Sequence, residues 1–360
     1  MKRTFSFLFS LLLIGGLLAA CGTNSGTAGS TPSSGQTVKG DLPPLEKPAK
    51  VIIAEDGAAS GAGFYIADKK GYFKQYNIEV EFASFANSDD MLPALAAGKI
   101  DVAGGISSAA FFNSIAQGID VKMIADKGHN RKGKSYFTFV IDRDQLDQIK
   151  DYPDLKGKRI GVSTQNAVDD YIFQQMLNYA GLKREEVQFV LIPDFANMMA
   201  SMQNNSIDAA LQIEPLIAKG EAEGIHVKFK DATDYAPNAQ IAMVLASPQF
   251  LTERRDVAVR FMAAYLKGLR DYNDAFVKEK GNQDEIIDIM TQYTALKDKT
   301  LWKKVNVTGL DPNGKMFVDD IKAQYEWYKS NGAIVGDADI HKAVDTSIAE
   351  EAVNVIGEYK

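Results

Sequence analysis

The sequence is short of the residue types on which many enzymes and metal sites depend. Its 360 residues include one cysteine, Cys21, and three histidines. A single cysteine excludes a disulfide framework and a multi-thiolate metal site. The histidines, at 129, 226 and 341, lie far apart, and no H-E-x-x-H pair occurs. We therefore expect no metal site, no cofactor, no catalytic residues and no enzymatic activity.

Basic tracts and the common nucleotide or hydrolase motifs are also missing. Forty Lys and Arg residues stand against 47 Asp and Glu residues, and the pI is near 5.2. This balance argues against a nucleic acid partner. The glycine-rich loop over residues 57–63 does not complete a P-loop, and Gly161-Val162-Ser163 does not complete a nucleophile elbow.

Only the N-terminus carries a long apolar run. Residues 5–18 follow Lys2 and Arg3 and end in Leu18-Ala19-Ala20-Cys21, which looks like a bacterial lipobox. We interpret residues 1–20 as a lipoprotein signal peptide and Cys21 as the lipidation site; the alternative is a short membrane anchor with an incidental cysteine. Residues 21–48, rich in Gly, Ser, Thr and Pro, are then a flexible tether. The expected location is the extracytoplasmic face of the cell membrane, held by lipid at Cys21.

The remaining sequence contains one stretch twice. Residues 100–108 return at 207–215, with flanking similarity between 91–98 and 198–205 and between 118–122 and 224–228. A period this long indicates a repeated lobe, since solenoid units span about 20–50 residues. Two related lobes imply a cleft between them.

Each copy alternates short apolar strands with helices, which favours an α/β fold with parallel strands. A helical tail after residue 247 has no counterpart in the first copy, so we expect it to pack on lobe I. The predicted lobes are residues 49–138 with 245–360 for lobe I, and 139–244 for lobe II. The two crossings between them would form a hinge.

Several motifs resemble one family when taken in order along the chain. They are the lipobox, Gly71-Tyr72-Phe73, the run from Gly98 to Ala103 and the run from Leu155 to Val162. Together they are similar to the substrate-binding lipoproteins of ABC importers, in the nitrate/sulfonate/taurine group and its thiamine-pyrimidine relatives. The resemblance implies a type II periplasmic-binding-protein fold, a two-lobe Venus flytrap. It also implies a ligand in the cleft and delivery to a permease with cytoplasmic ATPases.

The candidate ligand-binding residues lie where strands end and helices begin, because ligands of open α/β sheets bind there. They are Asp56, Ser60, Phe85, Asn87, Ser107, Ser108, Ser163, Thr164, Gln165, Asn166, Asn197 and Glu214. The repeat makes Ser107 the counterpart of Glu214. Polar residues at such positions also cap helices without any ligand, and the phenylalanines could belong to the core.

Charge at these strand ends suggests the ligand class. Asp56, Asp169, Asp170 and Glu214 lie near the expected cleft, and no Arg or Lys sits directly at a junction. A dry site for an inorganic anion would usually contain an Arg or Lys. Positive charge could come from His129, Arg131 and Lys134, which could equally form a solvated loop.

We therefore expect a small polar organic ligand such as an aliphatic sulfonate or taurine. A thiamine-pyrimidine precursor, a riboflavin-like heterocycle and nitrate stay open, and so does a sensory or structural lipoprotein that binds a partner protein. The eukaryotic pyrimidine synthases of this fold need a cysteine-rich motif, which a chain whose only cysteine is Cys21 cannot contain. We expect a monomer.

Overall fold

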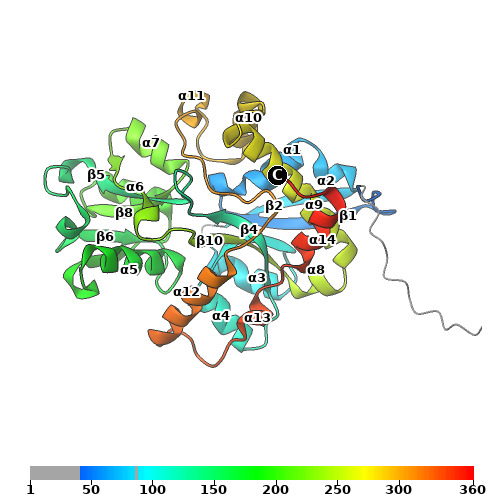
Figure 1. Cartoon of the computed structure of the whole chain (residues 1–360), viewed down its shortest axis with the longest axis horizontal. Helices are drawn as coiled ribbons and strands as arrows, with labels where there is room; N and C mark the ends of the chain where they lie inside the picture. Colours follow the sequence, from blue (N-terminus) through cyan, green and yellow to red (C-terminus); the bar gives the residue numbers. More distant parts are fainter. Residues whose placement is uncertain (1–40, 86–87) are drawn as a thin grey trace, which may run out of the picture. The chain divides into compact units, whose positions relative to one another are not determined.

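The computed structural model describes residues 41–85 and 88–360, which contain two five-stranded sheets (Figure 1). The sheet of lobe I has the order β2-β1-β3-β10-β4, and that of lobe II has the order β7-β6-β8-β5-β9. The strands of lobe I are β1 (Ala49–Glu55), β2 (Ile78–Ser84), β3 (Val102–Ile106), β4 (Lys122–His129) and β10 (Gln240–Ala246). Those of lobe II are β5 (Phe137–Asp142), β6 (Arg159–Val162), β7 (Gln188–Leu191), β8 (Ala209–Ile213) and β9 (His226–Lys228). The predicted α/β class and the two lobes are confirmed.

The duplication is visible in the strand register. Ile53 on β1 lies opposite Phe82 on β2 and Val102 on β3. In lobe II, Ile160 on β6 lies opposite Phe189 on β7 and Ala209 on β8. Each residue of the second trio follows its counterpart in the first by 107 positions. Both sheets are therefore built on one repeated plan.

One strand of each sheet runs against the expected parallel direction. β10 lies antiparallel between β3 and β4, and β5 lies antiparallel between β8 and β9. Each of these strands follows a strand of the other lobe in the chain, so it enters its sheet from the opposite end. The prediction of parallel sheets was wrong here because strand–helix alternation reports local connections alone.

The lobe boundaries also need correction. The chain leaves lobe I between His129 and Phe137 and returns between Lys228 and Gln240. The predicted boundary at 138/139 cuts into β5, and the one at 244/245 assigns most of β10 to the wrong lobe. An apolar run at 241–246 does not reveal which sheet it joins.

The helices follow the strands in the predicted order. Lobe I contributes α1 (Ala62–Lys69), α2 (Tyr72–Gln75), α3 (Leu92–Ala96) and α4 (Ala109–Ala116). Lobe II contributes α5 (Val168–Ala180), α6 (Phe195–Gln203) and α7 (Leu216–Ala222). The tail contains α8 (Pro248–Thr252), α9 (Arg255–Phe276), α10 (Gln283–Tyr293), α11 (Lys299–Trp302), α12 (Val318–Ser330), α13 (Ile340–Ala343) and α14 (Ser347–Ile356). Within the described ranges, none of these helices combines the length and the apolar character that a membrane span requires.

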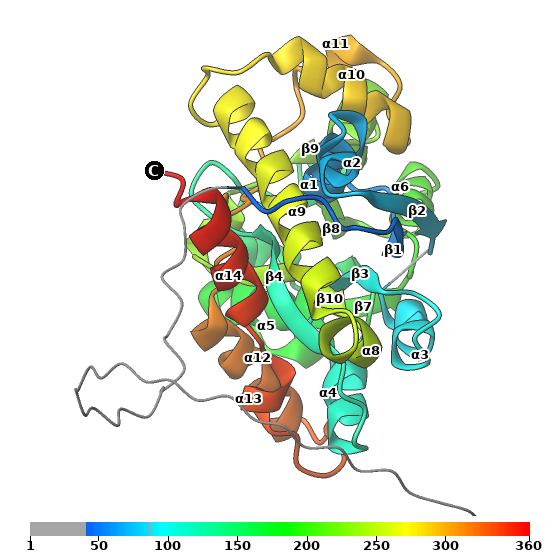
Figure 2. The same ribbon diagram turned by 90° about the vertical axis from the view of Figure 1, so that its right-hand side faces the viewer.

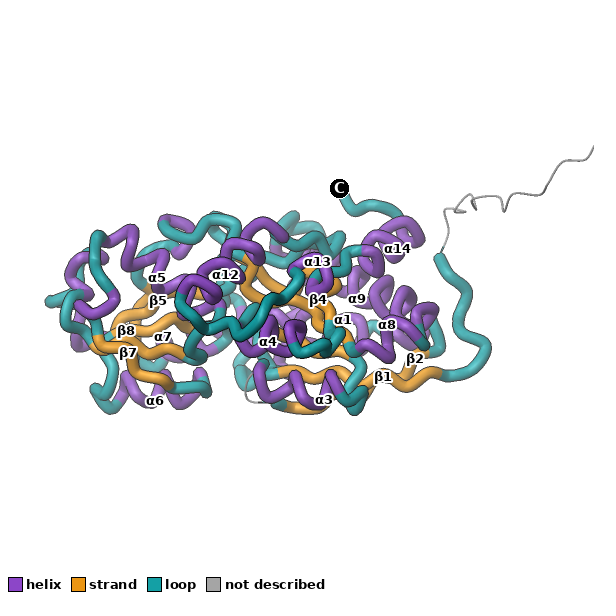
Figure 3. The backbone as a smooth tube through the Cα atoms, turned by 90° about the horizontal axis from the view of Figure 1, so that it is seen from below, coloured by secondary structure: helices purple, strands orange, loops and turns teal. Residues whose placement is uncertain are grey.

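Most of the tail packs on lobe I, as predicted. α9 lies against α1 and α14 (Figure 2). The backbones of α1 and α9 approach closely, because a Cβ on Gly268 would overlap the carbonyl oxygen of Gly63. Two tail helices also reach lobe II: α12 touches both α4 and α5 (Figure 3), and α11 touches α7. The tail therefore connects the lobes as well as covering one of them.

Residues 41–48, predicted as the end of the flexible tether, lie against lobe I. The Asp41 carboxylate accepts a hydrogen bond from the Tyr76 hydroxyl and is paired with Lys267. The Leu45 N–H donates to the carbonyl of Tyr76 at 3.1 Å, and Arg260 donates to the carbonyl of Pro43 at 2.9 Å. These contacts correct the tether's expected end at residue 48. The signal peptide, Cys21 and residues 22–40 lie outside the described residues.

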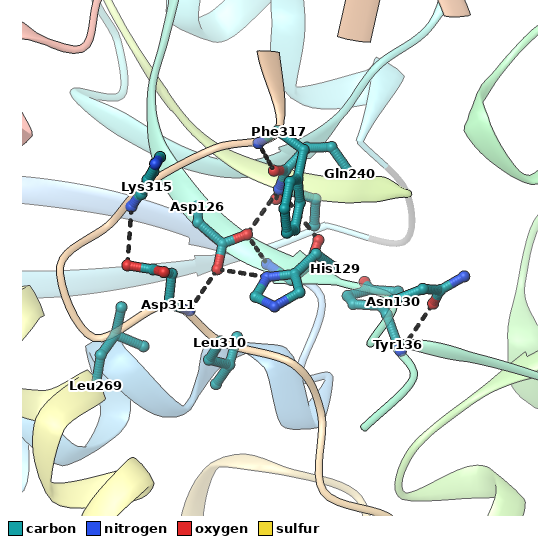
Figure 4. Close-up of polar contacts among 12 residues, drawn as sticks. Asp126, His129, Asn130, Tyr136, Gln240, Leu269, Leu310, Asp311, Lys315 and Phe317 are labelled. Atoms are coloured by element: carbon teal, nitrogen blue, oxygen red, sulfur yellow. Dashed lines mark hydrogen bonds and ion pairs between the residues drawn. The ribbon is translucent and has the colours of Figure 1, made fainter. Parts of the chain in front are cut away.

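A buried polar network holds the lobe I ends of both crossings (Figure 4). The Asp126 carboxylate accepts from Gln240 Nε2 at 2.7 Å and from the Asp311 N–H at 2.7 Å, and it lies 3.1 Å from His129 Nδ1. Gln240 Oε1 accepts from the Phe317 N–H at 2.8 Å. One carboxylate thus ties β4, β10 and the loop before α12 together, so the crossings leave from a fixed base.

Candidate functional site

A cavity of about 30 Å³ lies between the two sheets and is lined from both of them. Its lining residues are Asp56, Ser88, Gly104, Gly105, Ile106, Lys127, Tyr136, Phe137, Ser163, Thr164, Asp169, Pro193, Phe195 and Ala242. This volume is on the order of one or two water molecules. A larger ligand therefore requires the lobes or the lining side chains to move apart.

The lobes meet through a reciprocal pair of backbone hydrogen bonds. The Ala59 N–H of lobe I donates to the carbonyl of Glu214, and the Val168 N–H of lobe II donates to the carbonyl of Ser107, both at 3.0 Å. Ser107 and Glu214 directly follow the equivalent strands β3 and β8. Ala59 begins the short helical turn after β1, and Val168 begins α5, the α-helix after β6. Ser107 and Glu214 therefore contribute the same contact through their backbones. Opening the cleft would break both bonds.

A buried ion pair forms the lobe I side of the cavity. Lys127 Nζ lies 3.0 Å from Glu55 Oε1 and donates to Ser60 Oγ at 3.0 Å. Both charged side chains are almost fully buried, and Glu55 Oε2 accepts from the Tyr65 hydroxyl. Burial raises the pKa of Glu55 to about 7. Burial alone would lower the pKa of Lys127, but the carboxylates of Glu55 and Asp56 raise it above its usual value, so the lysine stays charged.

Gly104 on β3 makes room for this pair. A Cβ at that position would overlap Glu55 Oε1 and Lys127 Cε. The ion pair therefore packs directly on the backbone of the strand that ends at the cavity.

Asp169 forms the lobe II side, in the first turn of α5. Its Oδ2 accepts from the Ser163 N–H at 2.8 Å, from Ser163 Oγ at 2.7 Å and from the Thr164 N–H at 3.1 Å. Its Oδ1 has no hydrogen-bond partner in the described part of the chain, although the side chain is 1% exposed. Burial raises the pKa of Asp169 to about 6.

Three aromatic rings complete the wall. Tyr136 lies on the first crossing, Phe137 begins β5 and Phe195 begins α6. The ring centroids of Tyr136 and Phe137 are 5.0 Å apart, and those of Phe137 and Phe195 are 6.3 Å apart. A cation or a flat ring could pack on such a surface.

The carboxylate of Glu214, a predicted ligand contact, is engaged by backbone groups of the protein. Its carboxylate is 2% exposed and accepts from the N–H groups of Asn306 at 2.8 Å and Ala218 at 3.1 Å. It does not belong to the lining of the cavity. One of these donors, Ala218, belongs to the first turn of α7, as in the helix-capping alternative, and the other lies on a loop of the tail.

The other candidates divide into three groups. Asp56, Ser163 and Thr164 line the cavity, and Ser60 reaches it through Lys127. Phe85 packs against the core, Ser107 Oγ donates to the Tyr328 hydroxyl on α12, and Ser108 Oγ caps α4 by accepting from the Phe111 N–H; none of these three residues lines the cavity. The remaining predicted residues, Gln165, Asn166 and Asn197, are also absent from the lining, and Asn87 lies outside the described residues.

Sequence reasoning missed the lysine of the cavity. β4 continues to His129, which places Lys127 on a buried strand. His129 faces Asp126, while Arg131 and Lys134 form a short turn outside the cavity lining. The sequence did contain one signal for this ion pair: a lysine within an apolar strand, together with an acidic residue at the end of another strand.

The chain is similar to known proteins in sequence and in fold. A Brucella abortus relative is 24% identical over 268 residues, which are 71% of this chain and 72% of the relative. The alkanesulfonate-binding protein SsuA of Xanthomonas axonopodis pv. citri, bound to MOPS, superimposes with a TM-score of 0.66 at 16% identity, covering 84% of this chain and 100% of that one. The nitrate-binding protein NrtA of Synechocystis gives a TM-score of 0.68 at 13% identity, covering 87% and 89%.

These structural likenesses establish the periplasmic-binding-protein fold. The family described as NMT1/THI5 like matches residues 59–274, which is more than half of the chain and spans both lobes. The chain belongs to the NMT1/THI5-like family.

Proposed function

We propose that the chain is the extracytoplasmic solute-binding component of an ABC importer. It captures a small polar organic molecule between its lobes and presents the closed form to a permease with cytoplasmic ATPases. The observation that carries this proposal is the cavity lined by both sheets, with Lys127 on one side and Asp169 on the other. Binding, rather than turnover, is the role of this site.

The lipid anchor belongs to the same proposal. Cys21 follows the apolar run and the small residues of the lipobox-like sequence. Lipidation there would hold the protein at the outer face of the membrane, next to the permease that it serves. SsuA and NrtA, two proteins of the same fold, are named for binding alkanesulfonate and nitrate. An aliphatic sulfonate or taurine-like compound is therefore our first ligand class.

A thermal-shift panel on the detergent-purified full-length chain tests the proposal. Taurine, alkanesulfonates, nitrate, aminopyrimidines and riboflavin would be added singly, and co-purified compounds would be identified by native mass spectrometry. A true ligand at 100 times its Kd stabilises the native state by about 2.7 kcal/mol. We expect at least one compound to raise the Tm and to be recovered chemically unchanged.

Two outcomes would overturn this function. If no compound raises the Tm and none co-purifies, the body binds something other than a small solute, as a sensory or structural lipoprotein would. If the bound compound is recovered altered, the protein is an enzyme. Uptake assays in a strain without the permease would separate transport from sensing, because transport alone requires the permease.

A further inference from the structure

Asp169 is a buried carboxylate of the cavity lining that has neither an ion pair nor a full set of hydrogen bonds among the described residues. Asp169 is 1% exposed and lines the cavity, and its Oδ1 has no hydrogen-bond partner within the described ranges. A buried carboxylate oxygen without a donor is destabilising, because it has lost its hydrogen bonds to water and gained none from the protein. Such an atom in a binding cavity suggests that the ligand supplies the missing donor.

Neighbouring carboxylates show that the fold can neutralise such groups. Asp170, the next residue on α5, is paired with Arg184 at 2.6 Å, and Glu55 across the cavity is paired with Lys127 at 3.0 Å. Asp169 has hydrogen bonds from Ser163 and Thr164 but no ion pair in the described part of the chain. The position opposite Oδ1 is therefore suited to a cation.

Lys127 offers the complementary group. An ammonium has three N–H donors. Ser60 Oγ and Glu55 Oε1 occupy two directions around Nζ, each at 3.0 Å. Ser60 Oγ accepts a hydrogen bond from Nζ, so at least one N–H remains for an acceptor on the ligand, on the side of the cavity formed by lobe I.

The charges of the lining oppose a simple anion. Lys127 supplies one positive charge, whereas Asp56, Asp169 and the adjoining Glu55 supply up to three negative ones. The aromatic rings of Phe137 and Phe195 add a surface that attracts a cation. Nitrate or sulfate would meet net repulsion here, but an ammonium group would not.

We propose that Asp169 is a subsite for a protonated nitrogen, and that the ligand is a small organic ammonium compound whose other end carries an acceptor for Lys127. Zwitterions such as aminosulfonates and amino acids belong to this class, as do protonated aminomethyl heterocycles. The inference rests on the proposed solute-binding function and specifies which solutes the cavity selects.

Matched pairs of compounds test this on the unmodified full-length protein. Taurine would be compared with isethionate, and 4-amino-5-aminomethyl-2-methylpyrimidine with its 5-hydroxymethyl analogue, by calorimetry in potassium phosphate free of amines and sulfonates. The members of each pair differ only in whether the terminal group is an ammonium or a hydroxyl. We expect the ammonium member of any binding pair to bind at least tenfold more tightly, and any co-purified compound to carry a protonated nitrogen.

Asp169→Asn provides the second measurement. The substitution keeps the shape of the side chain and removes its charge, so affinity for the ammonium compound should fall at least tenfold. Affinity for the hydroxyl analogue should change little. Asp142→Asn is the matched control, because Asp142 is a buried lobe II carboxylate that also has one oxygen without a described partner, yet it does not line the cavity. That variant should bind like the parent.

The outcomes separate this inference from the function on which it rests. Equal binding of both members of a pair, or tight binding of nitrate or ethanesulfonate, would overturn the ammonium subsite and leave the solute-binding function intact. The same holds if Asp169→Asn binds the ammonium compound as tightly as the parent does. Absence of any small-molecule ligand would overturn both.

Discussion

The two lobes share a strand plan but differ in how they treat buried charge. Equivalent strands pair in the same register, 107 positions apart, in both sheets. In lobe I, the carboxylate of Glu55 is matched by the ammonium of Lys127 within the same lobe. In lobe II, Asp169 retains a carboxylate oxygen without a partner in the described residues.

This difference indicates that the sequence repeat determines the strand register of each lobe but not which charged side chains face the cavity. Backbone register depends on the alternation of apolar side chains along the strands. The residues after the last strand position do not pair with another strand, so they can change without disturbing the sheet. The lobe I side of the cavity carries the ion pair of Glu55 and Lys127, whereas the lobe II side carries the carboxylate of Asp169 without an ion pair in the described residues. The two sides of the cavity therefore differ in charge.

The largest effect should come from removing the cation of lobe I. Lys127→Met would leave the buried Glu55 carboxylate without its partner. Breaking a buried ion pair in this way costs about 3–5 kcal/mol. Urea unfolding followed by tryptophan fluorescence should show a lower midpoint.

The double variant Lys127→Met with Glu55→Gln is the control for that result. Because it removes both charges, it should recover most of the lost free energy of unfolding. Asp169→Asn should cost far less than Lys127→Met, since Asp169 has no ion pair among the described residues and its removal leaves no other charge without a partner. If Lys127→Met unfolds at the parent's midpoint, the ion pair does not stabilise lobe I.

Much of this comparison could be anticipated from the sequence, but the ion pair could not. The repeat of residues 100–108 at 207–215 correctly predicted two equivalent strands and the equivalence of Ser107 and Glu214. Pairing of Lys127 with Glu55 joins β4 to β1, which are not adjacent in the sheet. Strand periodicity carries no information on such a contact.

The position of the Glu214 carboxylate outside the cavity lining could not be anticipated for a similar reason. An acidic residue before a helix can face a ligand or accept from backbone N–H groups, and its spacing is the same in both cases. The deciding donor, the N–H of Asn306, lies on a tail loop 92 positions away. Only the fold brings that loop to the end of β8.

The next largest effect concerns pH and the equivalent residues Glu214 and Ser107. Burial raises the pKa of Glu214 to about 7 in the folded state, despite the N–H donors of Asn306 and Ala218 and the nearby charge of Lys228. A raised folded-state pKa means that this contribution to stability is fully present below about pH 4.5 and is lost as the pH rises through about 7. The parent should therefore lose about 2–3 kcal/mol from this group between pH 5 and pH 8.

Glu214→Gln should remove that part of the pH dependence. Urea unfolding of parent and variant at pH 5 and pH 8 measures it, and the variant should be relatively more stable at pH 8. Glu55 and Asp169, whose pKa values burial also raises, contribute a slope of the same sign in both proteins. Ser107→Ala, at the equivalent position in lobe I, should change the free energy of unfolding equally at both pH values. If Glu214→Gln and the parent lose the same free energy between pH 5 and pH 8, Glu214 is not the source of this pH dependence.

The smallest effect concerns the glycine beneath the ion pair. Gly104→Ala would place a methyl group against Glu55 Oε1 and Lys127 Cε, neither of which can move far without breaking the pair. Overpacking of this kind costs about 1–3 kcal/mol.

Gly161→Ala, on β6 of lobe II, is the matched control, because its new Cβ would meet mainly the Ile207 and Met198 side chains, which can rotate away. The free energy of unfolding should fall more for Gly104→Ala than for Gly161→Ala. The loss caused by Gly104→Ala should be smaller when it is measured against the Glu55→Gln variant instead of the parent, since a neutral side chain can turn away from the new methyl group. If the two glycine variants lose equal free energy, and Gly104→Ala costs as much in the Glu55→Gln background as in the parent, the ion pair does not constrain β3.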